Sequence, residues 1–216
     1  TTGNENTAVG YAALTTVTTA SGNTALGWGA MLSTTTGYAG VAIGVSSLGV
    51  QTTGNQNVAV GSLTLDALTT GSLNTAVGQA AGGAVTTGIH NTFVGYTTGD
   101  ATTTASFNTA IGTAALSGVS GDANTAIGHA AGTAITGGEN TVVGVNAGYA
   151  LTSGSNNLLL GQDAGRTGSP GGNLTTASNS IRLGDENIVE CQIQVDWTIA
   201  SDERDKTDFA ALDLGL

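Results

Sequence analysis

The sequence has 216 residues, of which 35 are glycine and one is proline, while 9% are charged and 4% are aromatic. Such a composition is typical of a repeat array or of a flexible low-complexity segment, and the mean hydropathy of +0.14 together with a clear period argues against the flexible segment. The formal net charge is −11 and no lysine or arginine precedes residue 166, which excludes nucleic acids and anionic membranes as partners of that region.

Other classes are excluded by what the chain lacks. Cys191 is the only cysteine, so there is no disulfide framework and no cysteine-based metal cluster. No apolar run approaches the ~18 residues that a transmembrane helix needs. The first residues, TTGNENTAVG, are not a signal peptide and look like part of a repeat that is already running, so we expect the chain to be a fragment.

A pentapeptide related to Asn-Thr-Ala-Val-Gly recurs between Asn6 and Gly161. Its copies are NTAVG (6–10), NTALG (23–27), GVAIG (40–44), NVAVG (57–61), NTAVG (74–78), NTFVG (91–95), NTAIG (108–112), NTAIG (124–128), NTVVG (140–144) and NLLLG (157–161). The glycines that close these copies follow each other at an almost constant interval, which is one residue shorter in just two coils. A period this regular indicates a solenoid in which each repeat is one coil.

Each copy is followed by a second short apolar segment, as at 11–14, 28–32 and 113–116, and then by a turn rich in threonine, serine and glycine. Two segments of about five residues and two turns leave no room for a helix. We therefore predict an all-β fold, a parallel β-roll or solenoid of about ten 16–17-residue coils. At ~4.8 Å per coil it forms a rod roughly 45–50 Å long.

The pentapeptide columns predict which side chains face the core. The fourth position is always aliphatic and the second is threonine or aliphatic, so we assign both to the interior. The third position, usually alanine, then faces outward. A small apolar residue on an outer face, beside a core this thin, suggests that the face packs against another chain, and we predict an obligate homo-oligomer.

Beyond residue 165 the composition changes. Residues 165–173 contain the only proline, SIRLG (180–184) resembles a degenerate last coil, and 186–200 alternates apolar and polar residues like a strand with one buried face. Cys191 lies on that face, where we expect an inert buried thiol. Taken alone, residues 201–216 are typical of a charged helix start capped by Ser201 or Asp202.

Two resemblances add to these inferences. The N-[ST]-x-[AVIL]-G pattern with its period, over residues 1 to about 165, resembles the head repeats of trimeric autotransporter adhesins and the shafts of phage tail fibres. Gly40 in place of asparagine and the two shorter coils depart from it. The resemblance implies a β-roll that associates as an elongated homotrimer.

The string Ser-Asp-x-Arg-x-Lys at 201–206, with DLGL at 213–216, resembles the opening of the intramolecular chaperone (peptidase S74) domain of phage fibres. That resemblance implies self-cleavage at the Ser201–Asp202 bond, with Ser201 as the nucleophile and Lys206 as its basic partner. A lysine held neutral can accept a serine proton. The domains are then a shaft (1–165), a neck with the last coil and a strand (166–200) and a truncated chaperone (201–216). A single self-cleavage, which needs the complete chaperone domain, does not make the protein an enzyme.

Few other residues are candidates for a site. Tyr11 and Trp28 stand in the column that follows the closing glycines, where they either contact a surface glycan or cover a strand edge as variable rim residues. His90 and His129 occupy different columns and are best interpreted as exposed turn residues. No metal-binding motif, nucleotide loop or paired carboxylates are evident, so neither metal nor cofactor is expected.

The leading functional hypothesis is an extracellular structural fibre shaft for host or surface attachment, from a phage virion tail fibre. A bacterial trimeric surface adhesin is the alternative. An ice-binding β-solenoid is a more distant one, disfavoured because the threonine column is assigned to the inward face. A glycan-degrading spike lacks the acids it would need. The expected partners are further copies of the chain and a cell-surface glycan or protein receptor bound by distal parts, with no nucleic acid and no membrane insertion.

Overall fold

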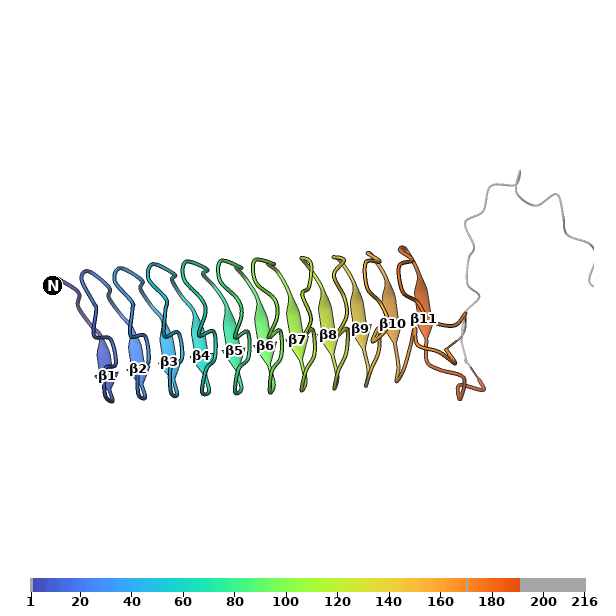
Figure 1. Cartoon of the computed structure of the whole chain (residues 1–216), viewed down its shortest axis with the longest axis horizontal. Helices are drawn as coiled ribbons and strands as arrows, with labels where there is room; N and C mark the ends of the chain where they lie inside the picture. Colours follow the sequence, from blue (N-terminus) through green and yellow to red (C-terminus); the bar gives the residue numbers. More distant parts are fainter. Residues whose placement is uncertain (1, 170, 191–216) are drawn as a thin grey trace, which may run out of the picture.

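The computed structural model describes residues 2–169 and 171–190, and it confirms the predicted fold class. The chain winds into a β-solenoid whose three-residue strands line one side of the rod (Figure 1). They are β1 (Thr7–Val9), β2 (Thr24–Leu26), β3 (Val41–Ile43), β4 (Val58–Val60), β5 (Thr75–Val77), β6 (Thr92–Val94), β7 (Thr109–Ile111), β8 (Thr125–Ile127), β9 (Thr141–Val143), β10 (Leu158–Leu160) and β11 (Ile181–Leu183).

The strands form a single sheet in sequence order, each pairing in parallel with the next. Equivalent pentapeptide positions are always paired, for example Ala25 with Ala42 and Leu26 with Ile43. The register is unchanged in the two shorter coils, because the missing residue is absorbed in the loops. The longer excursion between β10 and β11 is absorbed in the same way, so SIRLG (180–184) supplies the eleventh strand.

The predicted assignment of faces was wrong. The central residue of the strand points inward and is fully buried in β2–β10, as Ala25, Ala59 and Phe93 illustrate. The flanking positions two and four point outward, so that Leu26 is 46% exposed. The coil is narrow, and only a side chain that fits the space opposite can occupy the centre of the strand. Aliphatic character at position four therefore does not mark the core of this chain.

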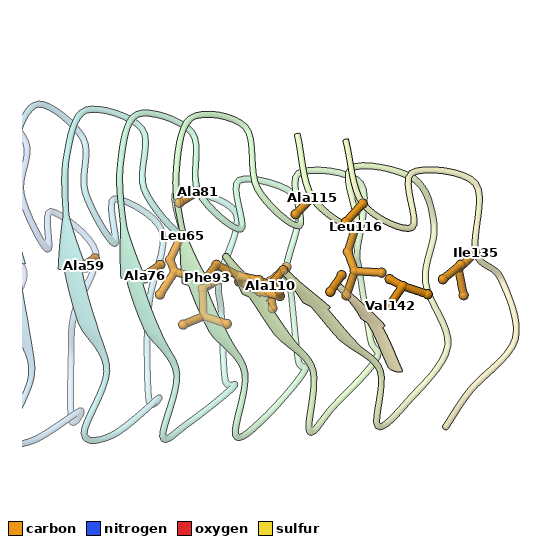
Figure 2. Packing of buried hydrophobic residues seen from close by; sticks show 14 of the residues in the cluster. Ala59, Leu65, Ala76, Ala81, Phe93, Ala110, Ala115, Leu116, Ile135 and Val142 are labelled. Atoms are coloured by element: carbon orange, nitrogen blue, oxygen red, sulfur yellow. The ribbon is translucent and has the colours of Figure 1, made fainter. Parts of the chain in front are cut away.

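The second apolar segment of each repeat, which follows the closing glycine, does not form a strand. It is a series of turns in which non-glycine residues adopt left-handed backbone conformations, such as Ala12 (φ 58°) and Leu14 (φ 50°). In about half of the coils this backbone directs one large side chain toward the strand, as with Leu48 and Leu65, both fully buried. These side chains and the strand centres form one continuous core along the rod (Figure 2).

Buried asparagines at position one hold successive coils together. The Asn74 backbone N–H donates to Asn57 Oδ1 at 3.0 Å, and its side-chain amide donates to the same oxygen at 3.2 Å and to the Gly88 carbonyl at 2.9 Å. We call this column the asparagine ladder. Its members are Asn23, Asn57, Asn74, Asn91, Asn108, Asn124, Asn140 and Asn157. It satisfies polar groups that would otherwise be buried without partners.

Gly40 interrupts the asparagine ladder, and Gln51 repairs it from the neighbouring turn. Gln51 is fully buried; its Oε1 accepts a hydrogen bond from the Asn57 amide at 3.0 Å, and its Nε2 donates to the Gly54 carbonyl at 2.8 Å. The glutamine thus supplies the acceptor that an asparagine at position 40 would have provided.

We expect Gln51→Leu to lower the free energy of unfolding by about 1–3 kcal/mol, because one Asn57 N–H would remain buried without an acceptor. Leucine is tolerated sterically, since Leu68 occupies the equivalent place one coil later. Urea denaturation followed by circular dichroism measures the change. The exposed Gln56→Leu, in the same coil, is the control and should stay within about 0.5 kcal/mol. Equal stability of Gln51→Leu and Gln56→Leu would contradict the repair.

Candidate functional site: the outer face of the sheet

The most extensive surface feature is the outer face of the sheet, which we define as the side chains of positions two and four on β1–β11. Position four is aliphatic in every strand, and its exposed fraction ranges from 56% at Val9 to 36% at Ile43 among its exposed members. Position two is threonine in seven strands and aliphatic in the others. The parallel register stacks these side chains into two straight columns along the rod.

The outer face is large and uncharged. Eleven three-residue strands, at ~4.8 Å between strands and ~3.3 Å per residue, give a strip of roughly 500 Å². The largest apolar patch of a monomeric protein is typically ~300–600 Å². Strands β1–β10 contain no charged residue, and the one in β11, Arg182, occupies the strand centre and not the outer face.

The carboxylates of the described residues all lie outside these strands. Desolvation raises the pKa of Asp66, and the negative charge of Asp100 two coils away adds to the effect. Desolvation also acts on Asp163, but hydrogen bonds from Arg166, Asn146 and Gln162 outweigh it and hold the pKa of that carboxyl below its ordinary value. Within residues 2–169 and 171–190, no three histidine, cysteine or acidic side chains gather as metal ligands would.

The structure brings together one pair of the predicted site residues. The Tyr11 and Trp28 rings stack with centroids 6.5 Å apart and planes 11° from parallel, and both remain exposed. His90 and His129 are not brought together; His90 stacks instead on Phe107, with ring centroids 5.3 Å apart. The remaining predicted residues, Cys191, Ser201, Asp202 and Lys206, lie outside the described residues.

Two features of the structure were not predicted from the sequence. Phe107 stands one repeat after His90 in the column before the asparagine, and the constant length of the repeat was a signal for their contact. A groove of about 400 Å³ also crosses β9–β11, lined by Glu139, Asn156 and Asn179 among others. Its lining comes from equivalent positions of three successive coils, namely positions one and two of the pentapeptide and the residue before them.

Comparison with known proteins gives no relative. No protein-family model, curated protein or solved structure matches the chain. In the described part of the chain, no helix is both long and apolar enough to span a membrane.

Proposed function

We propose that this chain is the shaft of a homotrimeric fibre used for attachment to a host or a surface. One observation carries the proposal: an unbroken aliphatic column runs along an uncharged sheet face for the full length of the solenoid. Water contact over such a strip is unfavourable by ~25 cal/mol per Å² of apolar surface. Association through this face removes that cost.

The dimensions of the face are suitable for self-association. Roughly 500 Å² per chain is more than half of the ~800 Å² that each partner buries in a standard stable interface. Three copies that turn this face toward a common axis form a closed assembly with every face covered. The number three comes from the resemblance to autotransporter heads and tail-fibre shafts, and the exposed face supplies the physical reason for association.

The C-terminal resemblance favours a phage tail fibre, located on the virion, over a bacterial trimeric surface adhesin. In this proposal the chaperone trimerises the fibre and is then released by cleavage between Ser201 and Asp202, with Ser201 as nucleophile and Lys206 as its base. The shaft holds distal receptor-binding parts at a distance from the particle and catalyses no reaction on other molecules.

Light scattering of the full chain tests the assembly. We expect a solution mass three times the 21.0 kDa of one chain. Ile111→Asp, at a 39% exposed site on the outer face, should shift the mass toward that of one chain, because it would bury an unpaired carboxylate at a cost of several kcal/mol. Thr104→Asp, in an exposed turn, is the control and should leave the mass unchanged. If the wild type were a folded monomer in solution, the proposal would be wrong.

A second candidate, an ice-binding solenoid, is favoured by the corrected face assignment. Thr7, Thr24, Thr75, Thr92, Thr109, Thr125 and Thr141 all lie on the outer face, in register. The objection that these threonines point inward is therefore removed. Aliphatic residues interrupt the column, however, and the fully aliphatic column beside it fits a protein interface better. Thermal hysteresis shown by a monomer would establish ice binding, whereas a trimer without hysteresis would exclude it.

A further inference from the structure

The Tyr11–Trp28 pair forms an exposed aromatic patch at the N-terminal end of the rod. Tyr11 is 77% exposed and Trp28 53% exposed, so both present large apolar rings to the solvent. Parallel rings with centroids 6.5 Å apart are offset and cannot cover each other completely. Each ring therefore leaves part of its face accessible to a ligand.

The backbone fixes the spacing of the two aromatic residues. Hydrogen bonding between coils continues past the strands, since the Tyr11 carbonyl accepts from Gly29 N–H at 2.9 Å and the Trp28 carbonyl from Ser46 N–H at 2.8 Å. The two side chains therefore leave the backbone one coil apart before any ligand arrives. Such preorganisation lowers the entropic cost of binding.

The surroundings of the rings are open and uncharged, with the exposed Val45 next after Trp28 in their column. A Cβ atom added at Gly29, beside Trp28, would have the Ser46 hydroxyl oxygen at 3.7 Å as its one neighbour, so there is free space there with a hydrogen-bonding group at its edge. No charged residue or histidine occurs between residues 6 and 65. An ionic ligand would find no counter-charge on this part of the chain.

We propose that Tyr11 and Trp28 form a stacking platform for a neutral pyranose unit of a surface glycan, with the Ser46 hydroxyl as a hydrogen-bonding neighbour. The C–H face of a sugar ring is weakly electropositive and complements the negative face of an aromatic ring. The shaft itself then contacts the polysaccharide, in addition to any receptor bound by distal parts. This inference goes beyond the proposed function and does not require the trimer.

The test uses the full chain carrying Trp197→Phe, which leaves Trp28 as the one tryptophan. Soluble neutral glucan, mannan and galactan are titrated while the Trp28 fluorescence is recorded. We expect at least one of them to shift the emission with a saturable curve. Trp28→Phe should retain part of the affinity, measured by calorimetry, whereas Trp28→Ala and Tyr11→Ala should each weaken it roughly tenfold.

Tyr96→Ala is the matched control. Tyr96 is 54% exposed and occupies the same column, but its neighbours there are Gln79 and Thr113, so it has no ring beside it in that column. Its replacement should leave the affinity unchanged. Failure of all three polysaccharides to bind, or an equal loss in Tyr96→Ala, would overturn the inference.

Light scattering separates this inference from the proposed function. The variant Tyr11→Ala/Trp28→Ala should keep the solution mass of the wild type, because the platform is not needed for assembly. A change of mass would show that a second copy of the chain occupies the rings, which overturns the glycan site while leaving self-association intact.

Discussion

Gly78→Ala is expected to lower the free energy of unfolding by about 4 kcal/mol or more, a loss that only a few kinds of single substitution produce. Gly78 closes the fifth pentapeptide with φ of 131°, a conformation that L-residues rarely adopt. A Cβ atom at this position would also collide with the Gly95 carbonyl group of the next coil. Since that coil is held by the same parallel hydrogen bonds, it cannot move away without breaking them.

Gly22→Ala is the control for this prediction. Gly22 also has a positive φ, 68°, but a Cβ there would meet its nearest neighbour at 3.8 Å. The equivalent position in the next coil is Ala39, with φ of 54°. We expect Gly22→Ala to change the stability by at most about 1 kcal/mol. Both variants are compared by urea denaturation followed by far-UV circular dichroism. If the two substitutions had similar effects, steric exclusion at the closing glycines would not be what maintains their spacing.

The fold was predictable because it depends on a periodic signal. The nearly constant interval between the closing glycines sufficed to predict the parallel register and the absence of helices between the strands, independently of any family. The side that each residue faces was not predictable by the same means. Alternation along a strand defines two faces but does not say which one is buried when both carry apolar residues.

Three residues show why the face assignment failed. Ala42 is buried while Val41 and Ile43, its larger neighbours, point outward. In a chain that buries its core alone the reverse would be expected, because the larger side chains gain more from burial. The better signal was the recurring size relationship between position three and the residue six places later, where Leu48 fills the space that alanine leaves. The candidate site suffered from the same error, since the outer face was assigned to the core.

Two features were harder to predict from the sequence: the hydrogen bond by which Gln51 compensates for Gly40, and the stacking of Tyr11 on Trp28. Gln51 contacts Asn57 only because a turn folds back across the core, which no period indicates. Tyr11 and Trp28 occupy the same column, which predicts that they are neighbours on adjacent coils. The parallel orientation of their rings depends on side-chain rotamers that the sequence does not specify.

Side-chain volumes across the core are matched within a coil or between neighbouring coils. Ala59 at the strand centre faces Leu65, whereas Phe93 has Gly99 in the equivalent place. A Cβ at Gly99 would overlap the Phe93 ring. One at Gly82, a coil earlier, would lie 2.8 Å from Leu65 Cδ2 and 2.9 Å from Phe93 Cδ2. The Phe93 ring therefore occupies the space that a leucine fills at the equivalent of Gly99 in other coils, and it shares the space at Gly82 with Leu65. Figure 2 shows Phe93 and Leu65 among the side chains of this core.

Phe93→Ala alone should destabilise the protein by about 3–5 kcal/mol, because it leaves a cavity that neighbouring glycines cannot close. Gly99→Leu alone should cost about 1–3 kcal/mol through overlap with the ring. Leucine is compatible with the backbone there, since Gly99 has φ of 63° and Leu65 and Leu116 adopt 49° and 47° at equivalent positions.

The combined variant Phe93→Ala/Gly99→Leu decides whether volume matching governs this core. We expect it to be more stable than Phe93→Ala by about 2 kcal/mol, because the alanine–leucine pair reproduces the packing at Ala59 and Leu65. Together with the loss expected for Gly99→Leu alone, this corresponds to a coupling energy of about 3–5 kcal/mol between the two sites. Urea denaturation of the wild type and the three variants gives the coupling energy. Additive losses would mean that each coil packs independently of the volume opposite it, and that the pairing of small with large residues along the rod has another cause.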